Sequence, residues 1–151
     1  MSIKYLILSI VILVVIIVAF NFIPRENITI ENEVETTLDQ TVSELSAKSY
    51  DIVYNHDGGS ENYLIQEAIF KDNDSAEKFA ETFIEDITNY TAKRESLIIG
   101  DFEGYSFVTL SLESKESGFG LLIRKGDSMI YGSGIDKNNL IKVTEWFINR
   151  Y

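Results

Sequence analysis

DNDSAEKFAETFIEDITNY, residues 72–90, has the pattern of an amphipathic helix. Apolar side chains recur at every third or fourth position, which predicts one continuous apolar stripe. The stripe consists of Ala76, Phe79, Ala80, Phe83, Ile84, Ile87 and Tyr90. Either Asp74 or Ser75 would accept hydrogen bonds from the free N–H groups of the first turn, with Glu77 placed to assist. We expect this helix to lie on a sheet, because its stripe needs an apolar partner.

A hairpin is expected immediately before this helix. Residues 49–54, SYDIVY, are rich in β-branched and aromatic side chains, and residues 63–71, YLIQEAIFK, alternate between two faces. Residues 55–60 between them contain asparagine, aspartate and two glycines, which is typical of a loop. Two strands joined by a polar loop predict a β-hairpin.

Four further strands and a final helix are expected after residue 90. The strands are predicted at residues 97–99, 105–112, 119–124 and 128–132. Gly126 can take the positive φ that a tight hairpin turn needs. Gly120 and Gly132 lie inside strands, which predicts a bulge or a large side chain packed over bare backbone. Asp136 is expected to cap the final helix.

The segments before the hairpin carry weaker signals. Residues 37–47 show a helical period, and we expect a short amphipathic helix there. Residues 24–36 alternate charged and apolar side chains, and we interpret them as a stalk or linker. Strands that are grouped together predict an α+β domain, residues 37–151, with a twisted antiparallel sheet of about six strands covered by two or three helices. The expected order of elements is (α)ββαββββα.

Residues 5–23, YLILSIVILVVIIVAFNFI, predict a membrane anchor. The stretch has no charged residue, and as a helix it would extend about 28 Å, close to the thickness of the hydrocarbon core of a bilayer. Two alternatives remain open. A cleaved signal peptide has a shorter apolar region and a small-residue cleavage site, which residues 20–24 do not show. A pilin-like leader continues its helix, whereas Pro24 stops this one.

A short tail, residues 1–4, precedes the predicted anchor. This is the usual geometry of a signal anchor whose amino terminus lies in the cytoplasm. We therefore expect residues 25–151 on the extracytoplasmic side of a cell membrane that the chain crosses once. Lys4 and Arg25 flank the anchor on opposite sides, so the distribution of positive charge does not decide the orientation. With so short a tail, we expect no cytoplasmic signalling domain.

The charge of the chain is strongly negative and unevenly distributed. The net charge is −11, and residues 26–92 contain 16 acidic side chains against three lysines. This sign disfavours nucleic acid and anionic membrane surfaces as partners. It is typical of a solvated acidic surface or of a protein with a cationic partner. The absence of cysteine excludes disulfides, thiol catalysis and cysteine-ligated zinc.

Residues 98–148 carry a resemblance to a known family. The turn Gly100-Asp101-Phe102-Glu103-Gly104-Tyr105, the strand end Tyr131-Gly132-Ser133-Gly134 and the helix start Asp136-Lys137-x-x-Leu140-Ile141-Lys142 are similar to the closing half of small exported α+β modules of the PsbP type. Related domains occur in bacterial and archaeal envelope proteins. The resemblance implies a binding or assembly module without a shared catalytic apparatus, and it transfers no functional residue.

One group of residues has the composition of a metal site. His56, Asp57 and Glu61 lie close together around a glycine-containing loop. A protein metal site usually needs three or four ligands from a rigid framework, and short matches in acidic loops arise often by chance. We therefore predict no resident metal or other cofactor, and His56, Asp57 and Glu61 are the candidates if a metal is bound.

The function predicted from the sequence is that of a non-enzymatic binding or envelope-assembly module. We identify no catalytic residues. A pocket lined by Tyr63, Tyr105 and Tyr131 would support binding of a small ligand. The expected partners are the membrane, through residues 5–23, and an envelope protein. The alternative is a metal-dependent hydrolase that uses His56 and the neighbouring carboxylates.

Overall fold

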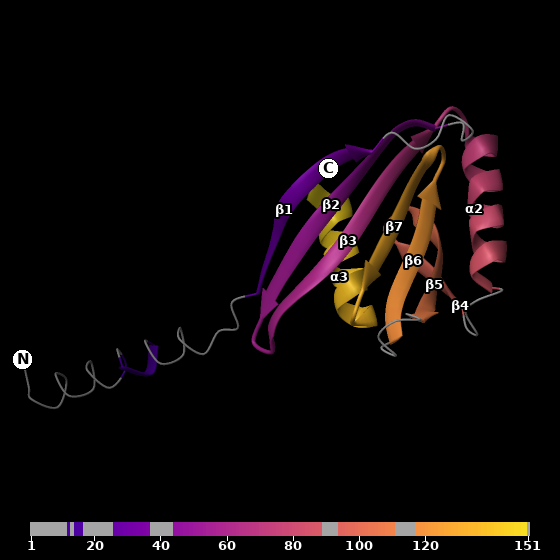
Figure 1. Cartoon of the computed structure of the whole chain (residues 1–151). Coiled ribbons are helices and arrows are strands. Elements are labelled where there is room, and N and C mark those ends of the chain that lie inside the picture. The colour runs from indigo at the N-terminus through magenta and orange to yellow at the C-terminus, as the bar shows by residue number, and fades with distance from the viewer. Residues whose placement is uncertain are drawn as a thin grey trace, which may run out of the picture.

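Seven antiparallel strands form one sheet in the computed structural model, which describes residues 12, 14–16, 26–36, 44–88, 94–110 and 117–150 (Figure 1). The elements are β1 (Asn27–Thr36), β2 (Glu44–His56), β3 (Gly59–Phe70), α2 (Asn73–Thr88), β4 (Arg94–Ile99), β5 (Phe102–Leu110), β6 (Ser117–Lys125), β7 (Ser128–Gly134) and α3 (Lys137–Arg150). The strand order is β1-β2-β3-β7-β6-β5-β4, so β1 and β4 are the two edges. The expected architecture of one antiparallel sheet with helices packed on it is confirmed, with strands predominating.

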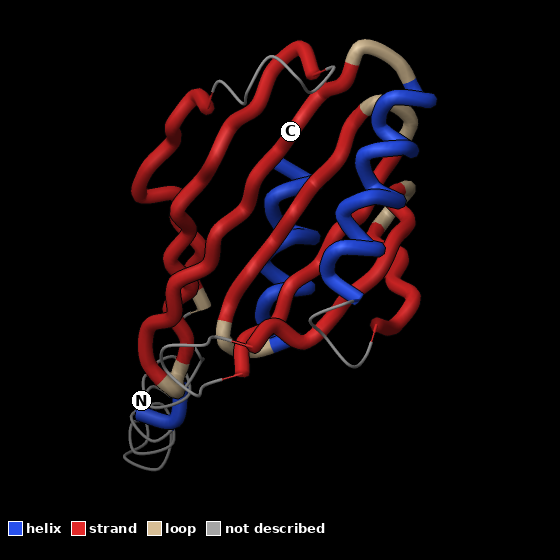
Figure 2. The backbone as a smooth tube through the Cα atoms, turned by 45° about the vertical axis from the view of Figure 1, so that its right-hand side comes forward, coloured by secondary structure: helices blue, strands red, loops and turns tan. Residues whose placement is uncertain are grey.

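Helices α2 and α3 cover opposite faces of the sheet (Figures 1 and 2). Helix α3 lies against β3, β4, β6 and β7, and α2 contacts β3, β6 and β7 on the other side. Successive side chains of a strand point to opposite faces, so a strand such as β3 can contribute to both layers. Tyr63 and Ile65 of β3 pack towards α3, and Ala68 and Phe70 pack towards α2.

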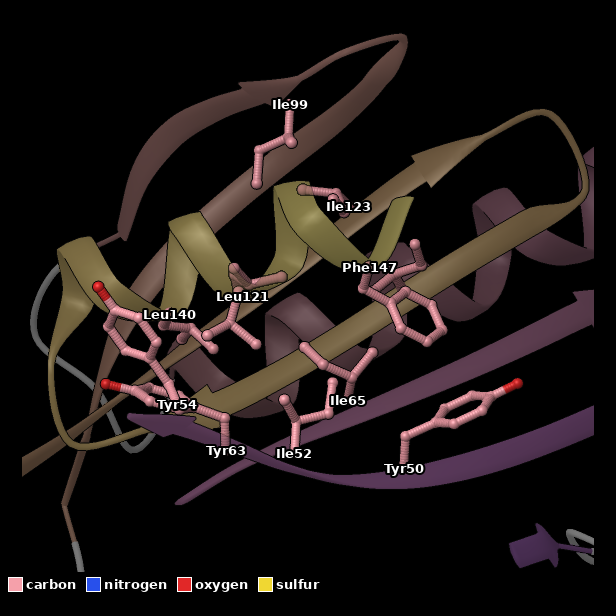
Figure 3. Packing of buried hydrophobic residues seen from close by; sticks show 12 residues of the cluster. Tyr50, Ile52, Tyr54, Tyr63, Ile65, Ile99, Leu121, Ile123, Leu140 and Phe147 are labelled. Carbon is pink, nitrogen blue, oxygen red and sulfur yellow. The ribbon is translucent and has the colours of Figure 1, made fainter. Parts of the chain in front are cut away.

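The larger core lies between the sheet and α3 (Figure 3). Its buried members are Tyr50, Ile52, Tyr54, Tyr63, Ile65, Ile99, Leu121, Ile123, Ile130, Leu140, Val143 and Phe147. The rings of Tyr50 and Phe147 meet edge to face with centroids 4.8 Å apart, a favourable geometry for two aromatic quadrupoles. Burial of this many large side chains supplies the main driving force for folding.

The smaller core lies under α2 and confirms the predicted apolar stripe. Phe70, Ala76, Phe107, Leu122 and Met129 are its buried members. Phe79, Ala80, Phe83 and Ile84 of the stripe pack against them. The side chains of Ile87 and Tyr90 lie outside the described residues.

The cap of α2 differs from the predicted one. The backbone N–H of Ser75 donates to Asp72 Oδ1 at 2.8 Å, so Asp72 is the capping residue rather than Asp74 or Ser75. Strand β3 ends at Phe70 and the helix begins at Asn73, which leaves Asp72 as the residue that precedes the first turn. The predicted cap of α3 is confirmed, because Asn139 N–H donates to Asp136 Oδ1 at 2.8 Å.

Two predictions about glycines are confirmed. Gly126 has a φ of 60° in the β6–β7 turn, a backbone conformation that residues other than glycine rarely adopt. Gly120 lies under the ring of Phe107, so close that an added Cβ would be 2.3 Å from Phe107 Cε2. A large side chain over bare backbone is therefore the reason for glycine at position 120.

The prediction for residues 24–47 was wrong where the structure describes them. Residues 27–36 of the predicted linker form β1, which pairs with β2 from Asn27 opposite Asn55 to Thr36 opposite Ala47. Residues 44–47 of the predicted helix are the start of β2, and residues 37–43 lie outside the described residues. The alternation that we interpreted as a stalk is that of an edge strand, with Ile28 and Ile30 on the core and carboxylates outward. This adds a seventh strand to the expected six.

Most of the predicted anchor, residues 5–23, and the whole tail, residues 1–4, lie outside the described residues. Within the described ranges, no helix combines the length and the apolar character that crossing a bilayer requires. The anchor stays a prediction from the sequence.

Candidate functional site

The three tyrosines predicted to line one pocket do not lie together. Tyr105 and Tyr131 occupy one row of the sheet, because both are paired with Leu122 of β6. The same row continues to Gln66 of β3, opposite Tyr131. Tyr63 is three residues from Gln66 and therefore points to the opposite face, where it is buried under α3. A pocket shared by all three side chains is excluded by this register.

Tyr105 and Tyr131 have different environments on the α2 face. Tyr131 contacts the rings of Phe83 and Phe107 at centroid distances of 5.5 and 6.5 Å. Burial raises the pKa of its hydroxyl. Tyr105 lies at the side of this aromatic cluster, with the guanidinium carbon of Arg94 5.0 Å from its ring centroid, within the range of a cation–π contact.

Two of the three candidate metal ligands come together. His56 Nε2 lies 3.1 Å from Glu61 Oε1, and both side chains are about four-fifths buried. The N–H of Gly58 donates to His56 Nδ1 at 3.0 Å, so the proton of the neutral imidazole is on Nε2, facing Glu61. Asp57 is exposed in the turn. No group of three histidine, aspartate or glutamate side chains suited to a metal occurs among the described residues.

Glu61 is the centre of a polar network that ties the β2–β3 hairpin to α3. Its Oε2 accepts hydrogen bonds from the hydroxyl of Tyr63 and, at 3.0 Å, from Asn139 Nδ2. Burial opposes ionisation of Glu61, but the hydrogen bonds from Tyr63 and Asn139 outweigh it and lower the pKa of the carboxyl. Burial and the neighbouring carboxylate raise the pKa of Tyr63. Glu61 thus stays charged and holds α3 against the hairpin.

A second set of polar contacts lies beside this network. Lys142 Nζ donates to Glu26 Oε2 at 2.6 Å and to the hydroxyl of Tyr54 at 3.0 Å. Tyr54 in turn lies beside the imidazole of His56, with ring centroids 4.9 Å apart. The side chains around Glu61 and Lys142 therefore make polar contacts with one another, and these contacts join β1, β2 and α3.

A groove of about 400 Å³ lies between α2 and the end of the sheet. We call it the α2 groove. It is lined by Glu77, Ala80, Glu81, Ile84, Ser96, Leu97, Ile98, Glu103, Gly104, Tyr105, Leu122, Ile123 and Arg124. Helix α2 packs over β3, β6 and β7, and β4 lies two strands beyond β6, so the groove opens beside the helix at this end of the sheet.

The α2 groove combines an apolar wall with an acidic rim. Ile98 of β4 is 70 % exposed there. Three carboxylates, those of Glu77, Glu81 and Glu103, line the groove together with the guanidinium of Arg124. Arg124 is already engaged, since it donates to Asn73 Oδ1 and, at 3.0 Å, to the carbonyl of Gly126.

The sequence contained one signal for this groove. Leu97, Ile98 and Ile99 are consecutive in a strand, so the middle side chain must point away from the face that the other two share. Ile99 is buried under α3 and Leu97 packs beside it. Whether Ile98 would be covered depended on the position of α2, which the sequence pattern does not give.

Comparison with known proteins found no matching family model, no matching curated protein and no matching solved structure. The resemblance to PsbP-type modules stays a prediction, and the assignment of function rests on the geometry.

Proposed function

We propose that this protein is a membrane-tethered binding domain whose α2 groove receives a basic segment of an envelope protein. The observation that supports it best is the exposed Ile98, an apolar side chain that lines the same groove as three carboxylates. Exposed apolar surface with a polar rim is a common mark of a protein-interaction site.

Charge complementarity favours a basic partner. Glu81 and Glu103 are both exposed, and within the described part of the chain neither has an ion-pair partner. Glu77 Oε2 lies 4.0 Å from Arg124 Nη2, and about half of the Glu77 side chain is exposed. A lysine or arginine entering the groove would meet these carboxylates, and the net charge of −11 would speed the encounter.

The apolar wall would supply affinity as well as position. Covering Ile98, together with the parts of Ala80 and Ile84 that line the groove, removes apolar surface from water. Complete burial of one isoleucine contributes about 2 kcal/mol. A partner segment with one apolar side chain between basic ones therefore fits the groove best.

The tether in this proposal is the predicted anchor at residues 5–23. Glu26 follows it by three residues and is bonded to Lys142 of α3. That contact would fix the domain at the point where the chain leaves the membrane. The partner is accordingly placed among proteins of the same extracytoplasmic surface.

The proposal is tested by photo-crosslinking in native membranes. A photoreactive phenylalanine analogue is introduced at position 98 and, as a matched control, at Ile135, which is 63 % exposed and does not line the α2 groove. We expect crosslinks from position 98 that map to a lysine- or arginine-rich segment, and that are lost with Glu81→Lys. Equal crosslinking from both positions, or crosslinks to segments without basic residues, would refute the proposal.

A further inference from the structure

We infer that the partner segment binds as an additional β-strand on the edge of β4, with alternate side chains entering the α2 groove. This inference rests on the proposed function and specifies how the groove recognises its partner. Addition of a strand to an exposed sheet edge is an established mode of peptide recognition.

The two edges of the sheet differ in how they are protected. Edge strand β1 contains a register irregularity between Ile30 and Asn32, and three carboxylates, Glu31, Glu33 and Glu35, lie along it. Bulges and charged side chains are the usual devices that prevent pairing at an edge. Strand β1 is therefore built to remain an edge.

Strand β4 lacks these devices in its second half. All six of its residues pair with β5 in continuous register, from Arg94 opposite Phe107 to Ile99 opposite Phe102. Its last four residues, Ser96 to Ile99, carry no charge and include no proline. An uncharged edge in regular register is a template for another strand.

The register places the groove where an added strand would project its side chains. Ile98 is opposite Glu103 of β5, and Glu103 is opposite Arg124 of β6, so the three share one row facing the groove. An added strand would lie about 4.8 Å beyond β4. Its residue opposite Ile98 would then contact that side chain, and a lysine two residues along the added strand would project to the same face, towards the acidic rim of the groove.

A second copy of this chain fits the edge less well. Two β4 strands paired edge to edge would bring the acidic rims of both grooves together, and each chain carries a net charge of −11. Like charges placed opposite each other destabilise an interface. The occupant that the charges favour is a basic extended peptide.

The test uses the full chain in a non-ionic detergent and a short blocked peptide, Thr-Lys-Thr-Val-Thr-Lys-Thr, whose lysines and valine share one face when it is extended. Two further versions carry N-methyl groups on the threonines only or on the lysines and the valine only. We expect millimolar or tighter binding, roughly tenfold slower hydrogen exchange at β4 amides, and loss of binding from N-methylation of one alternate set alone. That alternation is the signature of strand pairing, because only every second residue of a strand directs its N–H to one neighbour.

Three other outcomes would overturn the inference. Binding that Glu81→Gln weakens, but that leaves β4 exchange unchanged and tolerates both N-methylated peptides, would refute strand addition and leave the proposed function standing. No binding of the lysine–valine peptide up to about 1 mM, or equal binding of a glutamate–valine control, would refute both. Protection of β4 without peptide, with a dimer in sedimentation, would identify a second copy as the occupant.

Discussion

Lys142 on α3 donates a 2.6 Å hydrogen bond to Glu26, the residue that precedes β1. The two residues are 116 positions apart in sequence. Lys142 also donates to the hydroxyl of Tyr54 on β2, so one ammonium group joins the entry to β1, the strand beside it and helix α3. The segment that follows the predicted anchor is thus attached to the body of the domain.

Replacing Lys142 with methionine should loosen this attachment. The variant keeps the apolar stem and removes the ammonium group, so we expect a lower melting temperature than that of the unaltered chain. The difference between the two melting temperatures should be smaller at high salt, where exposed charges are screened. Lys125→Met is the matched control, because Lys125 bonds Asp101 in a more exposed pair that should contribute little. Equal melting temperatures for the Lys142→Met variant and the unaltered chain would contradict this role.

The pKa of Glu26 provides a second measurement of the same contact. Hydrogen bonds from Lys142 and then Tyr54 lower that pKa. A lowered pKa means that the carboxylate stabilises the fold above its unfolded-state pKa, and that this stability is lost as the pH falls through the folded-state value. We expect Lys142→Met to raise the Glu26 pKa in carboxyl NMR titrations and to cost stability at neutral pH but not in acid.

Tyr63→Phe should reveal the network around Glu61. The substitution removes a hydroxyl that donates to a largely buried carboxylate, so we expect a loss of about 1–3 kcal/mol at neutral pH and a higher pKa for Glu61. Because the pKa of Glu61 is lowered in the folded state, the difference from the unaltered chain should shrink as the pH falls through that pKa. Chemical denaturation at several pH values measures this difference in the free energy of unfolding.

The control for this prediction is Tyr105→Phe. Among the described residues, the Tyr105 hydroxyl makes no hydrogen bond, and the contact of Tyr105 with Arg94 uses the ring, which phenylalanine keeps. We expect a change below about 0.5 kcal/mol, as for most surface substitutions. If both phenylalanine variants lost the same stability at every pH, the pKa of Glu61 would not depend on the Tyr63 hydroxyl.

Local patterns in the sequence predicted the elements whose cause is local. The stripe of α2, the cap at Asp136 and the turn at Gly126 depend on neighbours within a few residues. Strand β1 could not be predicted in this way, because an isolated strand with carboxylates on one side resembles a charged stalk until β2 pairs with it. The sequence also placed His56 and Glu61 near each other, yet the partner Asn139 is 78 residues from Glu61 and depends on the tertiary fold.

Asp72 and Asp74 offer a direct comparison of the observed and the predicted cap. Asp72→Ala removes the acceptor of the Ser75 N–H, so we expect a lower melting temperature. Asp74→Ala removes only a favourable charge in the first turn of α2, so its effect should be smaller. The side-chain and backbone hydrogen bonds of Ser75 lower the pKa of Asp72, so the difference between the variants should diminish in acid. A larger effect at Asp74 would favour the cap expected from the sequence.

Gly120→Ala tests whether the Phe107 ring requires bare backbone beneath it. The new methyl group would be 2.3 Å from Phe107 Cε2, and the ring is held by Phe83 and Tyr131 on its other sides. We expect a loss of about 1–3 kcal/mol in the free energy of unfolding, as for other overpacked cores.

The matched substitution is Gly132→Ala, also inside a buried strand. There the nearest atom would be Ile65 Cδ1 at 3.1 Å, the flexible end of a side chain that can move, so the loss should be smaller. A double-mutant cycle with Phe107→Leu separates the clash with the ring from the effect that replacing glycine with alanine has on the strand backbone itself. Leucine leaves room for the methyl group. The double variant should therefore lose about 1 kcal/mol less stability than the sum of the losses in the two single variants. Strict additivity would mean that Gly120 is required for a reason other than the ring of Phe107.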